Sequence, residues 1–207
     1  MIRETGFLSC HLIFLAIAFA GDVTITSDSP TVDGVDLYNE VVTTTKIKWF
    51  SDTPNQGQQF TTGSSISLLL GFSFQLGTTS QVPIPQKIYT IRVVTFSGTT
   101  TTTIALEAGH TQAASENWSS GNWINFTFDT PVPLEANTLY GVDGEMTTSG
   151  AWQSGIPYIF RPSDAYSGGQ KYQRVDGDPT ASTVDSKDFN FHINLALVPK
   201  GSLFMIE

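Results

Sequence analysis

Cysteine is nearly absent from this sequence of 207 residues, since Cys10 is the only one. A disulfide framework is therefore excluded, and the fold must be held together by its hydrophobic core. Charged residues are also scarce, at 14% of the chain against about 25% in a typical soluble domain. Acidic residues outnumber basic ones, and the net charge of −9 disfavours nucleic acids and anionic lipids as partners.

Long runs of helix-forming residues are missing as well. After the first twenty residues no stretch is rich in Ala, Leu, Glu and Lys, whereas Thr, Val, Ile, Phe and Tyr are abundant and favour strands. The sequence also has no glycine-rich phosphate loop, no His-Glu-x-x-His motif and no Gly-x-Ser-x-Gly motif. It therefore carries no common signature of a nucleotide-binding protein, a zinc protease or a serine hydrolase.

The first twenty residues follow the pattern of a cleavable export signal. Arg3 supplies a positive charge, residues 7–20 are almost wholly apolar, and Ala18-Phe19-Ala20 matches the small-x-small cleavage site. The apolar run is shorter than the roughly 20 residues that span a bilayer core. We therefore expect residues 1–20 to be a signal peptide, the protein to be secreted or at the cell surface, and the mature chain to have no membrane span.

The rest of the sequence predicts many short strands. Apolar and polar residues alternate most clearly at 66–76, 88–96, 123–128 and 188–198. About ten such segments with turn signals every 8–12 residues are typical of an antiparallel sandwich or barrel. We predict an all-β fold with a single antiparallel β-sandwich of jelly-roll type over residues 35–198. A polar arm at 21–34 precedes it, and a short tail at 199–207 follows.

Carboxylates and histidines give weak signals for catalysis. Four acidic residues on predicted strands could form the carboxylate pair of a glycoside hydrolase: Glu107, Asp129, Asp143 and Glu145. Any acidic all-β chain would offer such a set, so a surface role is the default. His110 falls in a predicted loop, and His192 on the last strand is expected to be solvent-facing or hydrogen-bonded. We predict that the protein is not an enzyme and keep a glycoside-active enzyme as an alternative.

Aromatic residues in Gly- and Ser-rich loops are the strongest binding candidates. Trp118, Trp152 and Tyr166 lie in such loops, and Tyr172 is the fourth candidate. Their rings could stack on sugars while nearby polar groups bond the hydroxyls, and this predicts a polysaccharide or surface glycan as partner. Alternatively each ring folds back as a lid over the end of the core. The binding hypothesis requires Trp118, Trp152 and Tyr166 to converge on one face.

A group of aspartates suggests calcium as a cofactor. Asp176, Asp178 and Asp185 could offer the clustered oxygen ligands that calcium prefers. The spacing lacks the glycine and the distal glutamate of the helix-flanked calcium loop, and aspartate is also a common turn former. A calcium site and a turn without metal are therefore both open.

Several segments resemble a group of exported bacterial domains. The sequence Gln-Gln-Phe-Thr-Thr-Gly at 58–63 and the segments 123–141 and 164–172 are similar to choice-of-anchor β-sandwich domains that precede a PEP-CTERM sorting signal. The resemblance covers residues 56–198. It implies a surface or matrix module of jelly-roll topology, similar in outline to carbohydrate-binding modules, and it brings no catalytic residues. At the C-terminus, Lys200 replaces the acid of that sorting signal and no membrane helix or basic tail follows, which argues against anchoring by this route.

Taken with the resemblance, these features predict a non-catalytic secreted or surface module that binds glycan or extracellular matrix through loop aromatics. The first alternative is a structural surface protein that contacts copies of itself through strand edges. That alternative requires a long uncovered edge strand.

Overall fold

The computed structural model describes residues 23–40, 46–48, 55–77, 88–111, 119–146, 158–161, 166–174, 179–183 and 188–198. The predicted signal peptide and C-terminal tail lie outside these residues. The described part of the chain consists of strands, turns and extended segments and contains no helix. It accordingly has no helix that is long and apolar enough to cross a membrane.

Fourteen strands make up this part of the chain. Their bounds are β1 (Val23–Thr26), β2 (Leu37–Asn39), β3 (Lys46–Lys48), β4 (Asn55–Thr61), β5 (Ser67–Gln75), β6 (Ile88–Ser97), β7 (Thr100–Thr111), β8 (Trp123–Leu134), β9 (Leu139–Met146), β10 (Tyr158–Arg161), β11 (Lys171–Arg174), β12 (Ala181–Thr183), β13 (Asp188–Phe189) and β14 (Phe191–Leu197). The four segments with the clearest alternation in the sequence correspond to β5, β6, β8 and the pair β13 and β14.

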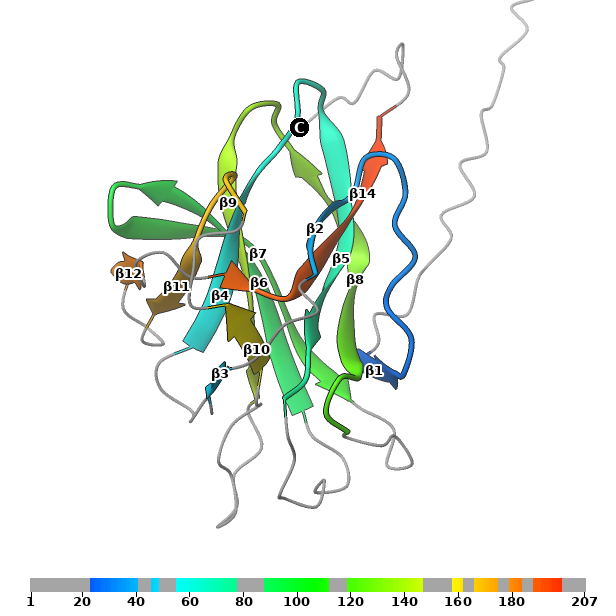
Figure 1. Cartoon of the computed structure of the whole chain (residues 1–207). Helices are drawn as coiled ribbons and strands as arrows, with labels where there is room; N and C mark the ends of the chain where they lie inside the picture. Colours follow the sequence, from blue (N-terminus) through cyan, green and yellow to red (C-terminus); the bar gives the residue numbers. More distant parts are fainter. Residues whose placement is uncertain are drawn as a thin grey trace, which may run out of the picture.

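The strands form two large antiparallel sheets and one small one (Figure 1). The five-stranded sheet has the order β1-β8-β5-β14-β2, and the six-stranded sheet has the order β12-β11-β4-β9-β6-β7. A three-stranded sheet, β13-β10-β3, adjoins them. Within the two large sheets, the four principal strands follow the orders β2-β14-β5-β8 and β4-β9-β6-β7. Following the chain through these eight strands, each strand lies in the other sheet from the one before it, except that β6 and β7 form a hairpin in the same sheet. This is the connectivity of a jelly roll, so the predicted all-β sandwich is confirmed.

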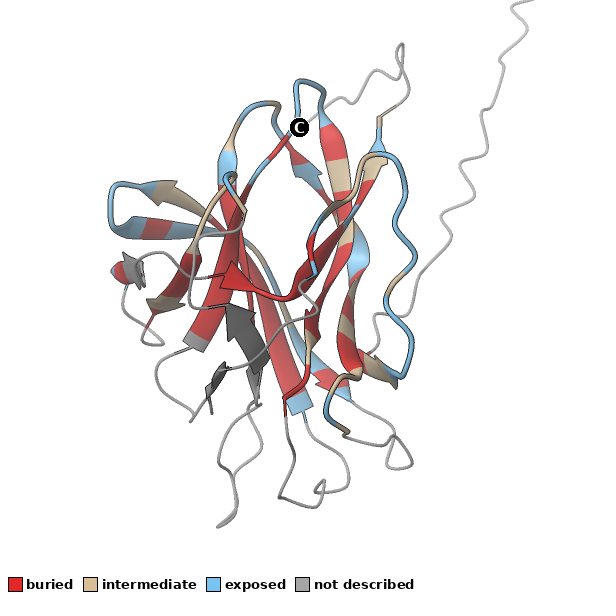
Figure 2. Ribbon diagram, in the orientation of Figure 1, coloured by how far each residue is buried: buried red, intermediate tan, exposed pale blue. Residues whose placement is uncertain are grey.

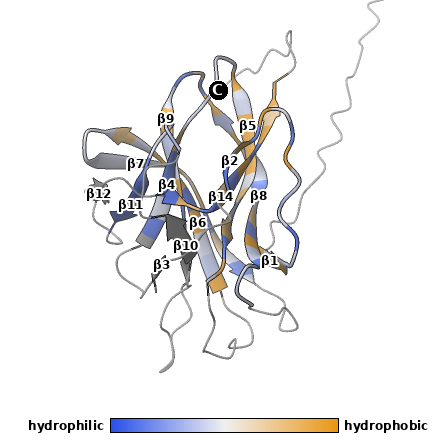
Figure 3. Cartoon of the chain, viewed as in Figure 1, coloured by the Kyte–Doolittle hydropathy of each residue, from blue (hydrophilic) through white to orange (hydrophobic). Residues whose placement is uncertain are grey.

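The main core lies between the two large sheets. Along β8, Ile124, Phe126 and Phe128 alternate with polar residues and are all buried. Phe126 stacks on Phe72 of β5 with 4.9 Å between ring centroids. Each buried aromatic or aliphatic side chain of this kind stabilises the fold by about 1.5–3 kcal/mol. Figure 2 shows the buried residues gathered along the strands of both sheets, and Figure 3 shows the matching alternation of hydropathy.

A smaller core covers the outer face of the six-stranded sheet. It consists of Val94, Tyr172 and Ala181, with Phe96 packed against them. The segment before β12 reaches the start of β7, because Thr101 N–H donates to Pro179 O and Ala181 N–H donates to Thr99 O. The six-stranded sheet therefore curls over this second core at one end.

Two local predictions differ from the structure. Part of the expected polar arm, Val23–Thr26, is strand β1, which pairs with β8 at the edge of the five-stranded sheet. The expected loop around His110 is instead the end of the long strand β7. Both segments have few large apolar residues, because edge strands are only partly covered, and this made them resemble loops.

Candidate functional site

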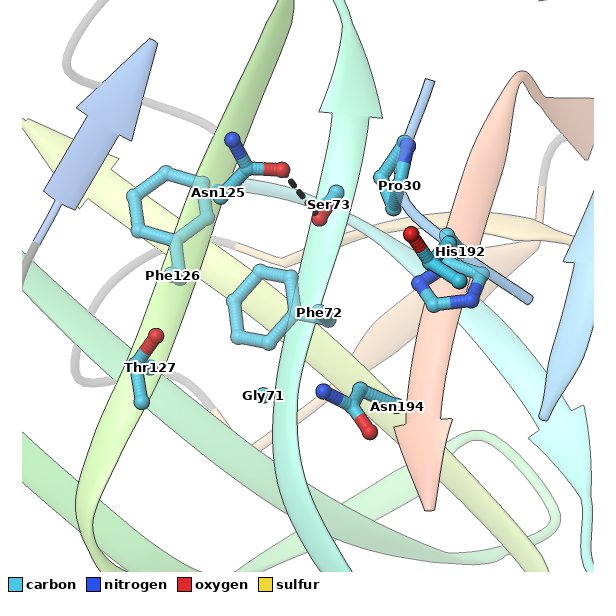
Figure 4. A pocket seen from close by; sticks show the side chains of 10 residues that line it. Pro30, Gly71, Phe72, Ser73, Asn125, Phe126, Thr127, His192 and Asn194 are labelled. Atoms are coloured by element: carbon cyan, nitrogen blue, oxygen red, sulfur yellow. Dashed lines mark hydrogen bonds between the residues drawn. The ribbon is translucent and has the colours of Figure 1, made fainter. Parts of the chain in front are cut away.

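A row of polar side chains crosses the outer face of the five-stranded sheet. The strand register places Asn125 of β8 beside Ser73 of β5, and Ser73 beside His192 of β14 (Figure 4). These residues alternate with core residues along their strands, so their side chains point away from the main core. Ser73 Oγ donates a hydrogen bond to Asn125 Oδ1 at 2.7 Å. Tyr38 of edge strand β2 continues the row beyond His192 and is 51% exposed.

The next row has a gap at its centre. Thr127 of β8 and Asn194 of β14 both pair with Gly71 of β5, which has no side chain. A Cβ added at Gly71 would overlap the backbone carbonyl oxygen of Phe126, so the close approach of β5 and β8 requires glycine here. The row therefore has no side chain between Thr127 and the exposed Asn194, and all three residues line a hollow on this face.

The N-terminal segment borders this hollow. Pro30 lies over the sheet (Figure 4), and Pro30 and Thr31 complete the lining of a cavity of about 290 Å³. This volume is at the lower end of the range for small-molecule sites, roughly 300–1,000 Å³. Among the described residues that line the cavity, none is Asp, Glu, Lys or Arg. Ser73 and His192 are only 5% and 2% exposed and are already hydrogen-bonded to Asn125 and Asp36. The groups that the cavity offers to a ligand are therefore the hydroxyls of Thr31 and Thr127 and the amides of Asn125 and Asn194. We call this cavity, together with the two polar rows, the outer groove.

Asp36 fixes the side of the outer groove that carries His192. Its Oδ2 lies 3.1 Å from His192 Nε2, and its Oδ1 accepts a hydrogen bond from Leu195 N–H at 2.7 Å. Burial lowers the pKa of His192, and the negative charge of Asp36 opposes that shift in part. His192 is therefore mainly neutral at pH 7 and donates from Nε2 to the carboxylate. The sequence predicted that His192 is either solvent-facing or hydrogen-bonded, and the structure shows that it is hydrogen-bonded.

Asp143 is the centre of a separate, buried polar cluster. It is 0% exposed and accepts hydrogen bonds from Arg92 Nη1 at 3.1 Å, Arg174 Nη2 at 3.4 Å and the Tyr172 hydroxyl at 2.8 Å. Burial raises the pKa of Tyr172 well above its usual value, and the charge of Asp143 adds to this effect. With its carboxylate bound in this way, Asp143 faces the two arginines and the phenol instead of solvent.

The prediction that Tyr172 stacks on a ligand is wrong. Its side chain is fully buried in the smaller core and packs edge-on against Phe96, with 5.3 Å between ring centroids. Gly57 and Gly141 provide the space, because a Cβ added at either position would overlap the Tyr172 ring. No face of the ring is available to a sugar.

Tyr166 packs onto the main core. Its ring meets Phe191 edge-on at 5.0 Å between centroids, and its backbone N–H donates to Asp188 Oδ2 at 2.9 Å. Burial raises the pKa of its hydroxyl. Tyr166 is therefore partly buried against the core, as the lid alternative requires, and ligand binding by its ring stays a prediction.

The other predicted site residues lie outside the described residues. These are the aromatics Trp118 and Trp152 and the aspartates Asp176, Asp178 and Asp185. Convergence of the loop aromatics and calcium binding at the aspartates remain predictions.

Sequence reasoning did not single out Tyr38, Ser73 or Asn194. The available signal was their alternation with core residues, as in Phe72-Ser73-Phe74. A polar residue at such a position is normal on the solvated face of an antiparallel sheet, so alternation alone does not mark a site. Only the pairing of β2, β5, β8 and β14 shows that these residues are neighbours.

Comparison with protein-family models and with curated proteins finds no match to this chain.

Proposed function

We propose that this protein is a non-catalytic module that binds a neutral polysaccharide in the outer groove. The observation that carries the proposal is the pair of polar rows, in which neighbouring strands present uncharged hydrogen-bonding groups around the gap at Gly71. Sugar hydroxyls both donate and accept hydrogen bonds, and hydroxyl and amide side chains can do the same.

The charge of the site favours a neutral ligand. The described lining has no lysine or arginine to pair with a carboxylate, sulfate or phosphate, and the chain has a net charge of −9. Long-range repulsion would therefore oppose an anionic polymer. A neutral glycan requires no ionic partner and is not repelled.

Tyr38 supports the proposal by adding an aromatic surface. It lies next to His192 in the strand register, on the same face of the sheet, and about half of its side chain is exposed. An aromatic ring beside a polar row can cover the apolar C–H face of a sugar while the hydroxyls meet polar groups. In this proposal Tyr38 takes the stacking role that the sequence assigned to the loop aromatics.

Export is part of the same proposal. If residues 1–20 direct the chain out of the cell, the outer groove would meet cell-surface or matrix polysaccharides. The resemblance of residues 56–198 to exported choice-of-anchor domains supports this location. Both the resemblance and the location are proposals.

Glycan-array screening of the purified protein, with neutral and anionic glycans on one surface, tests the proposal. We expect binding to neutral glycans, and calorimetry on a bound glycan should show at least tenfold weaker affinity for Tyr38→Ala and Asn194→Ala. Ile66→Ala is the matched control, because Ile66 is 50% exposed and does not line the outer groove. A glycan bound equally well by both groove variants would contradict the assignment.

Self-association is a second candidate function, favoured by strand β7. This strand has twelve residues and ends the strand order of its sheet. Its first residues are bonded to the segment before β12, and beyond them Ile104 and Leu106 are 43% and 55% exposed. Long apolar edges are templates for pairing with another chain. Light scattering should then show oligomers that Ile104→Lys converts to monomers, whereas a monomer at all concentrations would contradict this candidate.

A further inference from the structure

A glycine bulge turns two ligand-type side chains of β7 to the same face. Ile91 pairs with Glu107, and Tyr89 pairs with His110, although residues three apart on a regular strand face opposite ways. The extra residue is Gly109, whose φ of 88° lies in the left-handed region that favours glycine. Because Ile91 and Tyr89 both belong to the main core, Glu107 and His110 both point toward the interior of the sandwich.

Strand β8 bulges in the facing sheet. Leu69 pairs with Val132, and Gly71 pairs with Thr127, so one residue of β5 is opposite four residues of β8. The extra residues of β8 cannot all bond to β5, and their backbone groups need other partners.

Glu107 supplies two of these partners. Its Oε2 accepts a hydrogen bond from Asp129 N–H at 2.8 Å, and its Oε1 accepts one from Thr130 N–H at 3.2 Å. The side chain thereby joins the two sheets at the edge where β7 meets β8. These hydrogen bonds also hold the carboxylate in one orientation, as outer-shell bonds do for metal ligands.

His110 brings a buried nitrogen to the same place. Its side chain is 3% exposed, and Nε2 lies 3.2 Å from Glu107 Oε2. Apart from this contact with the Glu107 carboxylate, Nε2 makes no hydrogen bond in the part of the chain that the structure describes. A buried polar atom without a partner is unfavourable, so this nitrogen points to a ligand that satisfies it.

We propose that Glu107, His110 and Asp129 bind a divalent transition-metal ion of the zinc type. One ligand atom from each residue lies within 4.8 Å of the other two. The 3.2 Å between His110 and Glu107 matches the about 3.3 Å that separates two ligands bonded at roughly 2.0–2.1 Å to a tetrahedral ion. Asp129 is exposed, so solvent can reach the site and a water can take the fourth position.

The nitrogen ligand decides the class of metal. Calcium and magnesium take oxygen ligands almost exclusively, whereas zinc combines imidazole with carboxylates. The ion would link β7 to β8 across the edge of the sandwich. It would thereby strengthen the junction that Glu107 already forms.

Calorimetric titration of the purified full chain with zinc chloride tests the proposal. We expect Asp129→Asn and His110→Gln each to weaken zinc binding at least tenfold. Asp28→Asn is the matched control, because it removes the same charge from an exposed aspartate far along the chain and should leave the affinity unchanged. Cys10 and His11 are also zinc-type ligands, so the loss in Asp129→Asn is what assigns the ion to this site.

Cobalt substitution gives an independent spectroscopic measurement. The visible spectrum of bound Co²⁺ should be that of a four-coordinate site with nitrogen and oxygen ligands, and it should change in Asp129→Asn. Asp129 is on the surface, so Asp129→Asn should fold normally. It therefore tests the site even if His110→Gln fails to fold. Zinc binding that is absent, that is equal in the wild type and Asp129→Asn, or that an equal concentration of calcium abolishes would overturn the proposal.

Discussion

Ser73 donates a hydrogen bond to Asn125 across the β5–β8 pair, and this bond sets the position of the amide beside the outer groove. The Asn125 amide nitrogen lies 3.2 Å from Thr26 Oγ1 on β1, so the same side chain connects three strands. Replacing Ser73 by alanine leaves the amide oxygen without this donor. We expect Ser73→Ala to lower the free energy of unfolding by about 1 kcal/mol, measured by urea denaturation.

The same variant separates folding from binding. If the Asn125 amide contacts the ligand, Ser73→Ala should also weaken glycan affinity by more than the control Ile66→Ala does. A variant that loses stability and keeps full affinity would show that the Ser73–Asn125 pair serves the fold alone.

Gly71 lines the outer groove and lets β5 and β8 approach each other closely. A Cβ here would overlap the Phe126 carbonyl oxygen, so Gly71→Ala must separate β5 from β8. We expect a loss of about 1–3 kcal/mol in the free energy of unfolding, as for other overpacked positions. Gly63→Ala is the control, since a Cβ there meets nothing within 4 Å, and its effect should stay within about 0.5 kcal/mol. Equal stability of the two variants would contradict the close approach.

His192 gives the stability a dependence on pH. Because its pKa is lower in the folded protein than the ordinary value of 6.5, the unfolded chain binds more protons as the pH falls through this region. Its contribution to stability is therefore fully present above pH 6.5 and is lost as the pH falls below it. His192→Gln should flatten the plot of unfolding free energy against pH between about 7.5 and 5, relative to wild type. An unchanged slope in the variant would refute the lowered pKa.

Tyr172 should give the opposite dependence at alkaline pH. Burial and the Asp143 carboxylate raise its pKa, so the folded protein holds this proton above pH 10, where the unfolded chain releases it. The stability that this contributes is present below pH 10 and is lost as the pH rises. Tyr172→Phe removes both the titration and the hydrogen bond to Asp143.

Denaturation at two pH values measures both effects of Tyr172→Phe. The variant should be less stable than wild type by about 1–3 kcal/mol at pH 7, where a charged acceptor loses its donor. The difference should shrink above pH 10. A constant difference across this range would contradict the raised pKa.

The fold was largely predictable because local patterns determine it. In β5 and β8, large apolar residues alternate with polar ones, and this period of two marks a strand with one buried face. The segments that sequence reasoning misread depend on contacts with distant residues. His110 was predicted to lie in a loop, yet it belongs to β7, in which the preceding Gly109 forms a bulge. Tyr172 was predicted to bind a ligand, yet Gly57 and Gly141, far along the chain, make room for its ring inside.

The candidate site was less predictable than the fold. The outer groove depends on which residues β5, β8 and β14 place side by side, and Asn194 is 123 positions from its partner Gly71 in the sequence. The cluster of Glu107 and Asp129 depends in the same way on two bulges in different sheets. Four carboxylates were recognised from the sequence, but their pairing required the register.

Affinity for a neutral polysaccharide, measured by calorimetry on wild type, Asn194→Ala and Ile66→Ala, tests the central claim most directly. The outer groove predicts that wild type and Ile66→Ala bind alike and that Asn194→Ala binds at least tenfold more weakly. Equal affinity of all three proteins, or no binding to any neutral glycan on the array, would contradict the account.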